Sequence, residues 1–407
     1  MRTAPLLAML SAMSSALLLA WPAFAASPRA LFDNLHAETA GNADWIIDTD
    51  QPLPVPAQST VGPATPRNYW LGAISSYAID LVKRGYFVAT LSAPNAITYG
   101  DTTKTYDLSK FDVFIVPEPN TKFAAAESTA IFNFVREGGG LIAIGDHDVS
   151  DRNNDGFDSP KIWNLLDAQK RWGVHWQSTG EANRNFSQDS GNVEASPADS
   201  IIHGPEGVAD SLSFHGGTSF VLDPVANPRV RGLVWMNGFA HGTTGVMAAR
   251  SEYGSGRIVF CGDSSPVDDG SAQPGNSSIF DGWGEVSGRD SLFFLNATRW
   301  ATRRTIVLDA PVASSWRLAL APPRPNPSSG TITLGFTLPA AGRVSLEIVD
   351  LTGRRVRLLA SDTLAAGAHA VAWDGRDGAG RRMAPGVYLA RLVTPEGQRT
   401  RRLARVH

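Results

Sequence analysis

Two segments decide the fold of this chain: FDVFIV at residues 111–116 and FVREGGGLIAI at residues 134–144. Their apolar runs predict buried strands over Val113–Pro117 and Leu141–Ile144. The residues between them predict a helix over Phe123–Glu137, which Gly138-Gly139-Gly140 would end. A strand, a helix and a strand at this spacing predict a parallel pair joined by a right-handed crossover.

The same alternation extends outward in both directions. Towards the N-terminus we expect a strand at Ala30–Asn34, a helix at Tyr69–Arg84 and a strand at Phe87–Leu91. After a looser stretch of short strands and turns, the chain predicts a last buried strand at Arg257–Cys261 and a helix at Asp290–Thr302. The sequence therefore predicts an α/β domain with a parallel sheet, which binds ligands beyond the carboxyl ends of its strands.

Both quoted segments, together with YGSGRIVF at residues 253–260, resemble the class I glutamine amidotransferase-like fold, especially its ThuA-like branch. The resemblance covers residues 28–302 and implies a flavodoxin-like parallel sheet with helices on both faces. The family's catalytic cysteine sits on a tight turn after a strand. Here Cys261 lies within a predicted strand, and Gly145-Asp146-His147 follows Ile144. We therefore do not expect cysteine-dependent glutamine hydrolysis.

The C-terminal residues carry a second pattern, of short alternating strands separated by turns. Its turns contain Asn326-Pro327, Asp350-Leu351-Thr352-Gly353-Arg354, Trp373-Asp374-Gly375-Arg376-Asp377 and Pro385-Gly386-Val387-Tyr388. This set resembles FlgD-type Ig-like domains and the type IX secretion (Por) C-terminal sorting domain. We expect an all-β Ig-like sandwich over residues 326–407, after a proline-rich linker at residues 303–325. The resemblance implies export or sorting machinery, or the cell surface, as a partner.

The N-terminal residues predict a cleaved secretory signal peptide over residues 1–25. Arg2 precedes an apolar stretch at Leu6–Leu19, and Ala23-Phe24-Ala25 has the form of a signal peptidase site. No later segment has the length and apolar character of a membrane span. We therefore expect a secreted protein of bacterial type, located outside the cell or on its outer surface.

The composition excludes several classes of protein. With 36 Lys and Arg residues against 39 Asp and Glu residues, the net charge of −3 provides no basic excess for nucleic acid. A single cysteine excludes a disulfide scaffold and a cysteine-ligated zinc site.

Three predicted strand ends concentrate carboxylate and imidazole groups. The runs are Asp33-Asn34-Leu35-His36, Asp146-His147-Asp148 and Asp263-Ser264-Ser265. In a parallel sheet these ends share one edge, where such groups could hold a divalent ion or act as acid and base. The alternative is that they cap helices and satisfy loop amides. The candidate catalytic residues are His36, Asp146, His147, Asp263 and Ser264, with Ser264 as an esterase-like nucleophile.

The loop after the fourth strand resembles the start of a calcium-binding loop. Asp151, Asn153 and Asp155 occupy its first, third and fifth positions and Gly156 its sixth, but Ile162 stands where an EF-hand has glutamate. The remaining ligands could be Asp158, Asp148, Asp146 or Asp33. The predicted cofactor is structural Ca²⁺, with a second divalent metal possible at the strand-end edge; the alternative is an Asx-rich turn without metal.

Two functions follow from these features. The first is a secreted, metal-assisted hydrolase of a carbohydrate or an ester. The alternative is a non-catalytic, calcium-stabilised module that binds a small molecule or polysaccharide or serves at the cell surface. Because one fold hosts many activities, the sequence leaves open whether the chain is an enzyme.

Overall fold

The computed structural model describes residues 27–36, 45–48, 55–271, 280–302, 318–339, 342–364 and 367–406. The predicted signal peptide and residues 303–317 of the predicted linker lie outside these ranges. Within them, no helix has both the length and the apolar character needed to cross a membrane.

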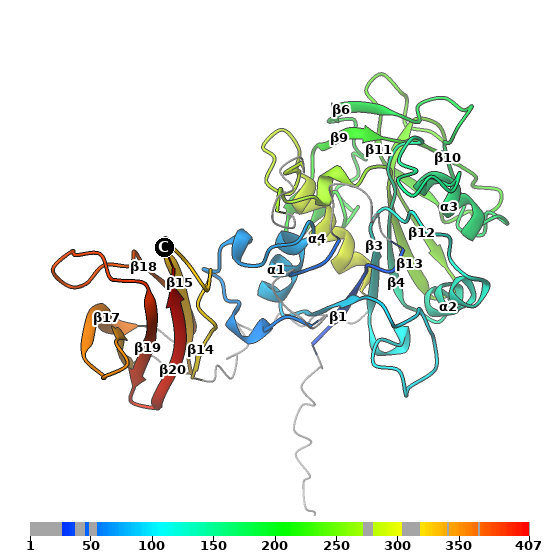
Figure 1. Cartoon of the computed structure of the whole chain (residues 1–407). Helices are drawn as coiled ribbons and strands as arrows, with labels where there is room; N and C mark the ends of the chain where they lie inside the picture. The colour runs from blue at the N-terminus through cyan, green and yellow to red at the C-terminus, as the bar shows by residue number, and fades with distance from the viewer. Residues whose placement is uncertain are drawn as a thin grey trace, which may run out of the picture.

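A nine-stranded sheet forms the centre of the N-terminal domain (Figure 1). Its first five strands run in the order β2-β1-β3-β4-β13 and are all parallel. They are β1 (Arg29–Asp33), β2 (Phe87–Leu91), β3 (Val113–Val116), β4 (Gly140–Ile144) and β13 (Gly256–Cys261). The prediction of a parallel α/β sheet is therefore confirmed, and the carboxyl ends of these strands lie at one edge.

The looser middle of the chain extends this sheet with antiparallel strands. They are β12 (Val246–Tyr253), β11 (Arg231–Trp235), β10 (Phe220–Leu222) and β5 (Val174–Trp176). The same region forms two separate ribbons. These pair β6 (Phe186–Ser190) with β9 (Leu212–Gly217), and β7 (His203–Gly204) with β8 (Gly207–Val208). The sheet is thus mixed: the strands from β2 to β13 on one side are parallel, and the strands added beyond β13 are antiparallel.

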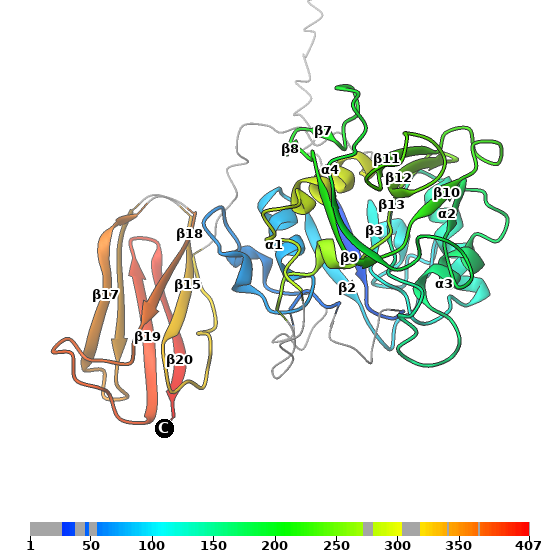
Figure 2. The same ribbon diagram turned by 90° about the horizontal axis from the view of Figure 1, so that it is seen from above.

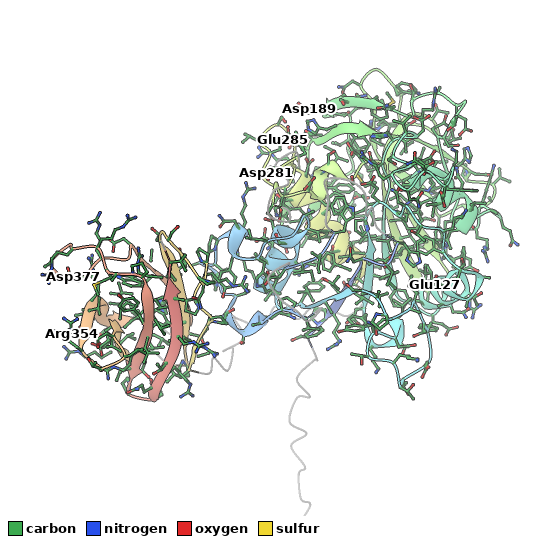
Figure 3. All side chains as sticks on the ribbon, in the orientation of Figure 1. Glu127, Asp189, Asp281, Glu285, Arg354 and Asp377 are labelled. Atoms are coloured by element: carbon green, nitrogen blue, oxygen red, sulfur yellow. The ribbon has the colours of Figure 1, made fainter. Side chains whose placement is uncertain are left out.

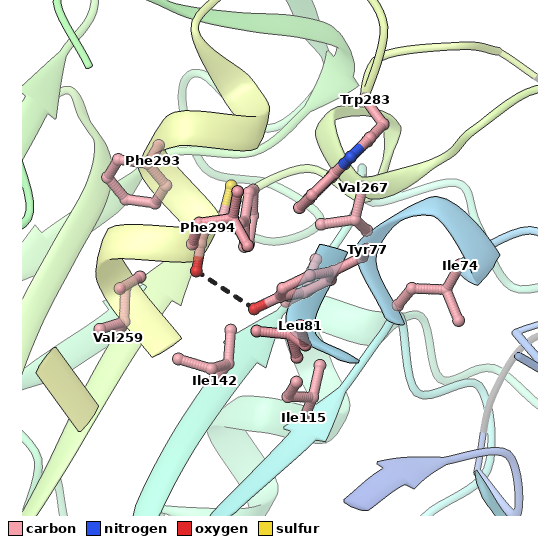
Figure 4. Packing of buried hydrophobic residues seen from close by; sticks show 14 of the residues in the cluster. Ile74, Tyr77, Leu81, Ile115, Ile142, Val259, Val267, Trp283, Phe293 and Phe294 are labelled. Carbon is pink, nitrogen blue, oxygen red and sulfur yellow. Dashed lines mark hydrogen bonds between the residues drawn. The ribbon is translucent and has the colours of Figure 1, made fainter. Parts of the chain in front are cut away.

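Helices cover both faces of the sheet. The apolar cluster on one face includes residues of α1 (Ser75–Lys83) and α4 (Asp290–Ala301), and Figure 4 shows Tyr77 there, donating a hydrogen bond to the carbonyl of Phe294 (3.3 Å). The cluster on the other face includes residues of α2 (Ala125–Arg136) and α3 (Ser159–Leu166). Successive residues of β1, β3 and β4 alternate between the two clusters, as a two-faced buried sheet requires. Four short 3₁₀ turns complete the domain: η1 (Gln58–Thr60), η2 (Arg67–Tyr69), η3 (Leu108–Lys110) and η4 (Ser265–Val267).

The triple glycine ends α2 and lets β4 start close to its neighbours. Gly138 has a φ of +117°, a conformation that side chains disfavour. A Cβ on Gly140 would lie 2.8 Å from the carbonyl oxygen of Ala301 at the end of α4. The glycines therefore allow the helix-to-strand turn and the packing of α4 on the sheet.

The C-terminal domain consists of two antiparallel sheets around one apolar core. The smaller sheet has the order β14-β15-β18 and the larger has the order β17-β16-β19-β20. Their strands are β14 (Ala319–Leu320), β15 (Ile332–Leu338), β16 (Gly342–Val349), β17 (Arg355–Leu364), β18 (Gly367–Trp373), β19 (Gly386–Thr394) and β20 (Gly397–Arg405). The prediction of an all-β C-terminal domain is confirmed. The sandwich also includes β14, whose residues lie within the predicted linker.

The sandwich lies beside the α1 side of the α/β domain in both views (Figures 1 and 2). Arg324, which pairs with Thr333 of the sandwich, donates hydrogen bonds from both Nη atoms to the carboxylate of Asp48, at 3.4 and 3.2 Å. The Asp48 side chain is only 1% exposed, so this ion pair is buried within the contact between the domains. Arg324 also lies over the ring of Tyr69.

Candidate functional site

A buried pair of carboxyl groups lies at the carboxyl edge of the central strands. Glu118 follows β3 and Asp146 follows β4; both are buried, and a hydrogen bond with Glu118 is among the influences that lower the pKa of Asp146. The Ser264 hydroxyl, from the loop after β13, donates to Glu118 Oε2 at 3.2 Å. Three neighbouring strands therefore bring these groups together, as the parallel topology predicts.

The surroundings of Asp146 disfavour the ionised form of its carboxyl group. Burial raises the pKa of Asp146 well above its ordinary value, and the negative charge of Asp263 raises it further. The backbone N–H of His147 donates to Asp146 Oδ1 at 2.7 Å, which partly offsets this effect. Because burial and the charge of Asp263 disfavour ionisation of Asp146, this carboxyl group holds its proton to a higher pH than an exposed aspartate does.

The backbone holds Glu118 in an unusual conformation. Its φ is +36°, which non-glycine residues rarely adopt, and it lies between Pro117 and Pro119. The Glu118 N–H donates to the carbonyl oxygen of Ile144 at 3.1 Å, which ties the end of β3 to the end of β4. Strained backbone of this kind concentrates at functional sites. Sequence reasoning missed Glu118, although the rule that a carboxylate follows a buried strand would have found it.

His147 lies next to this pair and is neutral. Burial and the nearby charge of Arg152 lower the pKa of its imidazole. Nδ1 accepts a hydrogen bond from the Val149 N–H at 3.2 Å, so the neutral ring carries its proton on Nε2. The side chain is 19% exposed, and Nε2 lies 3.9 Å from Asp146 Oδ2. His147 can therefore donate a hydrogen bond from Nε2 to a ligand.

Asp263 supports the loops of the site. Its carboxylate accepts hydrogen bonds from the backbone N–H groups of His215 and Ser265. Burial raises the pKa of this fully buried side chain. The structure therefore places Asp263 next to the Asp146–Glu118 pair, with its oxygens already engaged by the backbone.

Two other carboxylates, those of Asp33 and Glu127, bind His36. Its Nδ1 lies 2.9 Å from Asp33 Oδ2, and its Nε2 lies 3.2 Å from Glu127 Oε2. Burial acts to lower the pKa of His36, but the hydrogen bonds and charges of Asp33 and Glu127 outweigh it and raise the pKa to about 9. Both ring nitrogens of His36 are thus engaged, which favours a structural ion pair.

The calcium-type loop folds as a compact series of Asx turns. Asp151 Oδ2 accepts from the Gly156 N–H at 2.8 Å, and Asp155 Oδ1 accepts from the Phe157 N–H at 3.0 Å. Asn153 Oδ1 accepts from the Asp155 N–H at 3.0 Å. Asp158 caps α3 through the Lys161 N–H. Calcium binding by this loop stays a prediction.

The other predicted metal ligands have partners within the protein. Asp148 pairs with Arg184 at 2.6 Å, and Asp33 also accepts from the Leu35 N–H at 3.0 Å. Among the described residues, the predicted ligands do not gather three metal-ligating atoms within 4.8 Å; a group that does so lies nearby, at Asp189, His215 and Glu285.

Two pockets lie away from the carboxyl edge. One, of 460 Å³, is lined by Asp112, Gly138 and Ser255, which precede β3, β4 and β13 and so mark the opposite edge. The other, of 630 Å³, is lined by residues of β5 and β10, including His175, and by Glu181. Neither contains a predicted catalytic residue.

Comparison with known proteins identifies the second domain. Residues 326–397 match the model of the FlgD Ig-like domain. The predicted resemblance is confirmed over that range. None of the curated proteins compared with the chain matches it.

Some solved structures match one part of the chain each. FlgD from Xanthomonas campestris is 32% identical over 21% of this chain and 65% of its own, with a TM-score of 0.16. PorZ, a surface component of the type IX secretion system of Porphyromonas gingivalis, is 26% identical over 22% of this chain and 11% of its own, with a TM-score of 0.16. The N-terminal domain of IFT52 is 13% identical over 68% of this chain and 99% of its own, with a TM-score of 0.40.

Proposed function

We propose that the chain is an exported hydrolase that acts on an ester or a glycosidic bond at the carboxyl edge of its parallel sheet. The observation that carries this proposal is the juxtaposition of two buried carboxyl groups, Asp146 and Glu118, at the ends of neighbouring strands, where burial raises the pKa of Asp146. Such a pair can give a proton to a leaving group and accept one from the attacking water, which is the proton balance that hydrolysis requires.

His147 and Ser264 complete the proposed machinery. A neutral imidazole whose Nε2 carries the proton can stabilise negative charge that develops on a substrate oxygen. The Ser264 hydroxyl, which donates to Glu118, orients that carboxylate. His36 has no part in this proposal, because Asp33 and Glu127 engage both of its nitrogens.

The C-terminal sandwich supports the location of the proposed enzyme. Its FlgD Ig-like match, and the likeness of this region to part of the surface protein PorZ, favour export and attachment outside the cell. In this proposal the sandwich addresses or anchors the protein, and the α/β domain carries the chemistry.

The test is turnover of chromogenic ester and glycoside panels by the purified chain. We expect Asp146→Asn and Glu118→Gln each to lower kcat/KM by about 100-fold or more, because each removes one of the two proton-transfer groups. Asp362→Asn, an exposed acidic residue of the sandwich, is the matched control and should leave kcat/KM unchanged. Full activity in either edge variant would overturn the assignment.

A specific observation favours a second candidate, a non-catalytic binding module. Glu118 is 1% exposed and Asp146 is 6% exposed, so the pair lies below the surface, where a structural role is also possible. This candidate predicts no turnover on either panel, together with a changed melting temperature in Glu118→Gln. An inactive wild-type chain would favour it over the hydrolase.

A further inference from the structure

A second cluster of ligating groups lies close to the carboxyl edge. It comprises Asp189 in β6, His215 in β9 and Glu285 in the loop before α4, and each offers a ligand atom within 4.8 Å of the other two. His215 Nε2 and Glu285 Oε2 are 2.9 Å apart. Figure 3 labels Asp189 and Glu285, which come from segments far apart in the sequence.

Strand pairing sets two of these side chains on one face. In the antiparallel β6–β9 ribbon, Asp189 lies opposite Ser213, and Ser187 lies opposite His215. Residues two apart in a strand point to the same side, so Asp189 and His215 share the face that also holds Ser187 and Ser213. The ribbon therefore fixes a carboxylate and an imidazole side by side.

The loop before α4 presents the third group in a fixed position. The Glu285 N–H donates to the carbonyl oxygen of Gly282 at 3.0 Å, and the Ser287 hydroxyl donates to Glu285 Oε1 at 2.7 Å. Glu285 Oε2 remains directed at His215. The three ligands are thus positioned before any ion binds, which lowers the entropic cost of binding.

A buried carboxylate beside the cluster gives a second, independent indication. Asp290 is 1% exposed, and within the described part of the chain its Oδ2 has no hydrogen-bond partner. Its Oδ1 accepts from the N–H of Ser213, the residue opposite Asp189. The buried Asp290 carboxyl group therefore contacts the ribbon that carries Asp189 and His215, and a cation nearby would compensate for its burial.

The donor set indicates the kind of ion. One imidazole and two carboxylates suit a divalent transition metal, whereas calcium takes oxygen ligands. Tetrahedral zinc bonds of about 2.0–2.2 Å place neighbouring donor atoms about 3.3–3.6 Å apart, so the His215 and Glu285 ligand atoms, 2.9 Å apart, need to separate only slightly to bind the ion. We propose that Asp189, His215 and Glu285 bind a divalent transition-metal ion of the zinc type. Three protein ligands leave a coordination position for water or substrate.

The proposed metal site adjoins the carboxyl edge. A Cβ on Gly216, next to His215, would lie 3.1 Å from His147 Cδ2. Asp263 holds the backbone of His215, so one buried carboxylate braces both sites. Metal binding here goes beyond the proposed function and does not depend on it, because an inactive protein could still bind the ion.

The test uses the full chain, stripped with a chelator and then titrated with Zn²⁺ by calorimetry, with bound metal measured by elemental analysis. We expect one ion per chain, and a loss of affinity of at least about tenfold in His215→Ala and in Glu285→Gln. His175→Ala is the matched control. His175 and His215 are both 30% exposed and each pairs with a glutamate, but of the two, only His215 has a third ligating group within reach among the residues that the structure describes.

Four further outcomes decide the proposal. Glu285→Gln keeps the size of the side chain, so a folded variant with wild-type zinc affinity would overturn the site. Equal loss of affinity in His175→Ala would also overturn it, since binding would then follow surface histidines in general. Asp151→Ala should leave zinc affinity unchanged, which separates this site from the calcium-type loop. A wild-type chain that takes up no zinc at about 100 µM would also reject the proposal, whatever the result of the hydrolase assays.

Discussion

Two strand ends of the sheet each carry a histidine near carboxyl groups, but the two histidines differ in protonation state. After β1, His36 lies between two carboxylates, and its pKa is raised to about 9. After β4, His147 has a backbone N–H on one nitrogen, and burial and Arg152 lower its pKa. The first histidine is therefore a buried cation and the second a neutral donor. The partners of a histidine, more than its place at a strand end, decide what it can do.

Removal of the His36 side chain should have the largest effect. His36→Ala leaves the Asp33 carboxylate, 1% exposed, without its cation, and we expect a loss of about 3–5 kcal/mol of unfolding free energy. His147→Ala should cost about 1 kcal/mol or less, because its ring makes one weak backbone contact. Urea unfolding of both variants measures the difference. Equal losses would erase the contrast between the two strand ends.

The pH dependence of stability should report the same ion pair. Because the folded state holds the His36 proton more tightly, the pair contributes fully below a pH of about 6.5 and is lost as the pH rises through about 9. The shift corresponds to about 3 kcal/mol of unfolding free energy.

Asp268 complicates this pH dependence, because burial raises its pKa to about 9 as well. Asp268 changes the stability of the protein in the same direction as His36. Because its carboxyl group is harder to ionise in the folded state, the folded protein loses stability as the pH rises. The informative quantity is therefore the difference in unfolding free energy between the wild type and His36→Gln, measured as a function of pH. A difference that stays constant between pH 6 and pH 10 would contradict the assignment.

Replacement by asparagine should change the free energy of unfolding differently at Asp33 and at Asp146. Asp33→Asn weakens the partner of a buried cation and should cost about 2 kcal/mol at neutral pH. Asp146→Asn replaces a carboxyl group whose ionisation burial disfavours, so stability should stay within about 1 kcal/mol of wild type or rise. Thermal melts of the two variants, measured at one pH, test this. Destabilisation of the same size in both variants would show that the folded state depends on the negative charge of Asp146.

Calcium binding to the loop after β4 should have the smallest effect on stability. If its oxygens bind calcium with a Kd of about 10⁻⁴ M, as many extracellular modules do, about 1 mM calcium stabilises the fold by about 1 kcal/mol. We expect calcium to raise the melting temperature of the chelator-stripped chain, and Asp151→Ala to abolish that response. An unchanged melting curve in the wild type would favour an Asx-rich turn without metal.

The sequence predicts the parallel core well because its strands are continuous apolar runs. β2 has the predicted bounds, and β1, β3, β4 and β13 differ from prediction by one residue at most at either end. The antiparallel strands from β5 to β11 were not individually predicted. They are short, and long-range pairing stabilises them more than local pattern does.

The site was only partly predictable for the same reason. Asp146, His147, Asp263 and Ser264 follow strong strands, and topology brings them together. Glu118 lies between two prolines and has no neighbouring histidine, so it lacks the combination of carboxylate and imidazole that follows β1 and β4. Asp189 and Glu285 come from a polar strand and a loop, and only the pairing of β6 with β9 and the turn before α4 bring them to His215.

The buried contact between Arg324 and Asp48 has a consequence for cleavage of the chain. Arg324 lies just before the matched Ig-like segment at residues 326–397, so any cleavage that separates the two domains near this point would affect its contact with Asp48. A protease cut on the C-terminal side of Arg324 would leave the arginine attached to the α/β chain. A cut on its N-terminal side would take it away and expose a desolvated carboxylate to water. The position of such a cut would therefore decide whether Asp48 keeps its arginine partner.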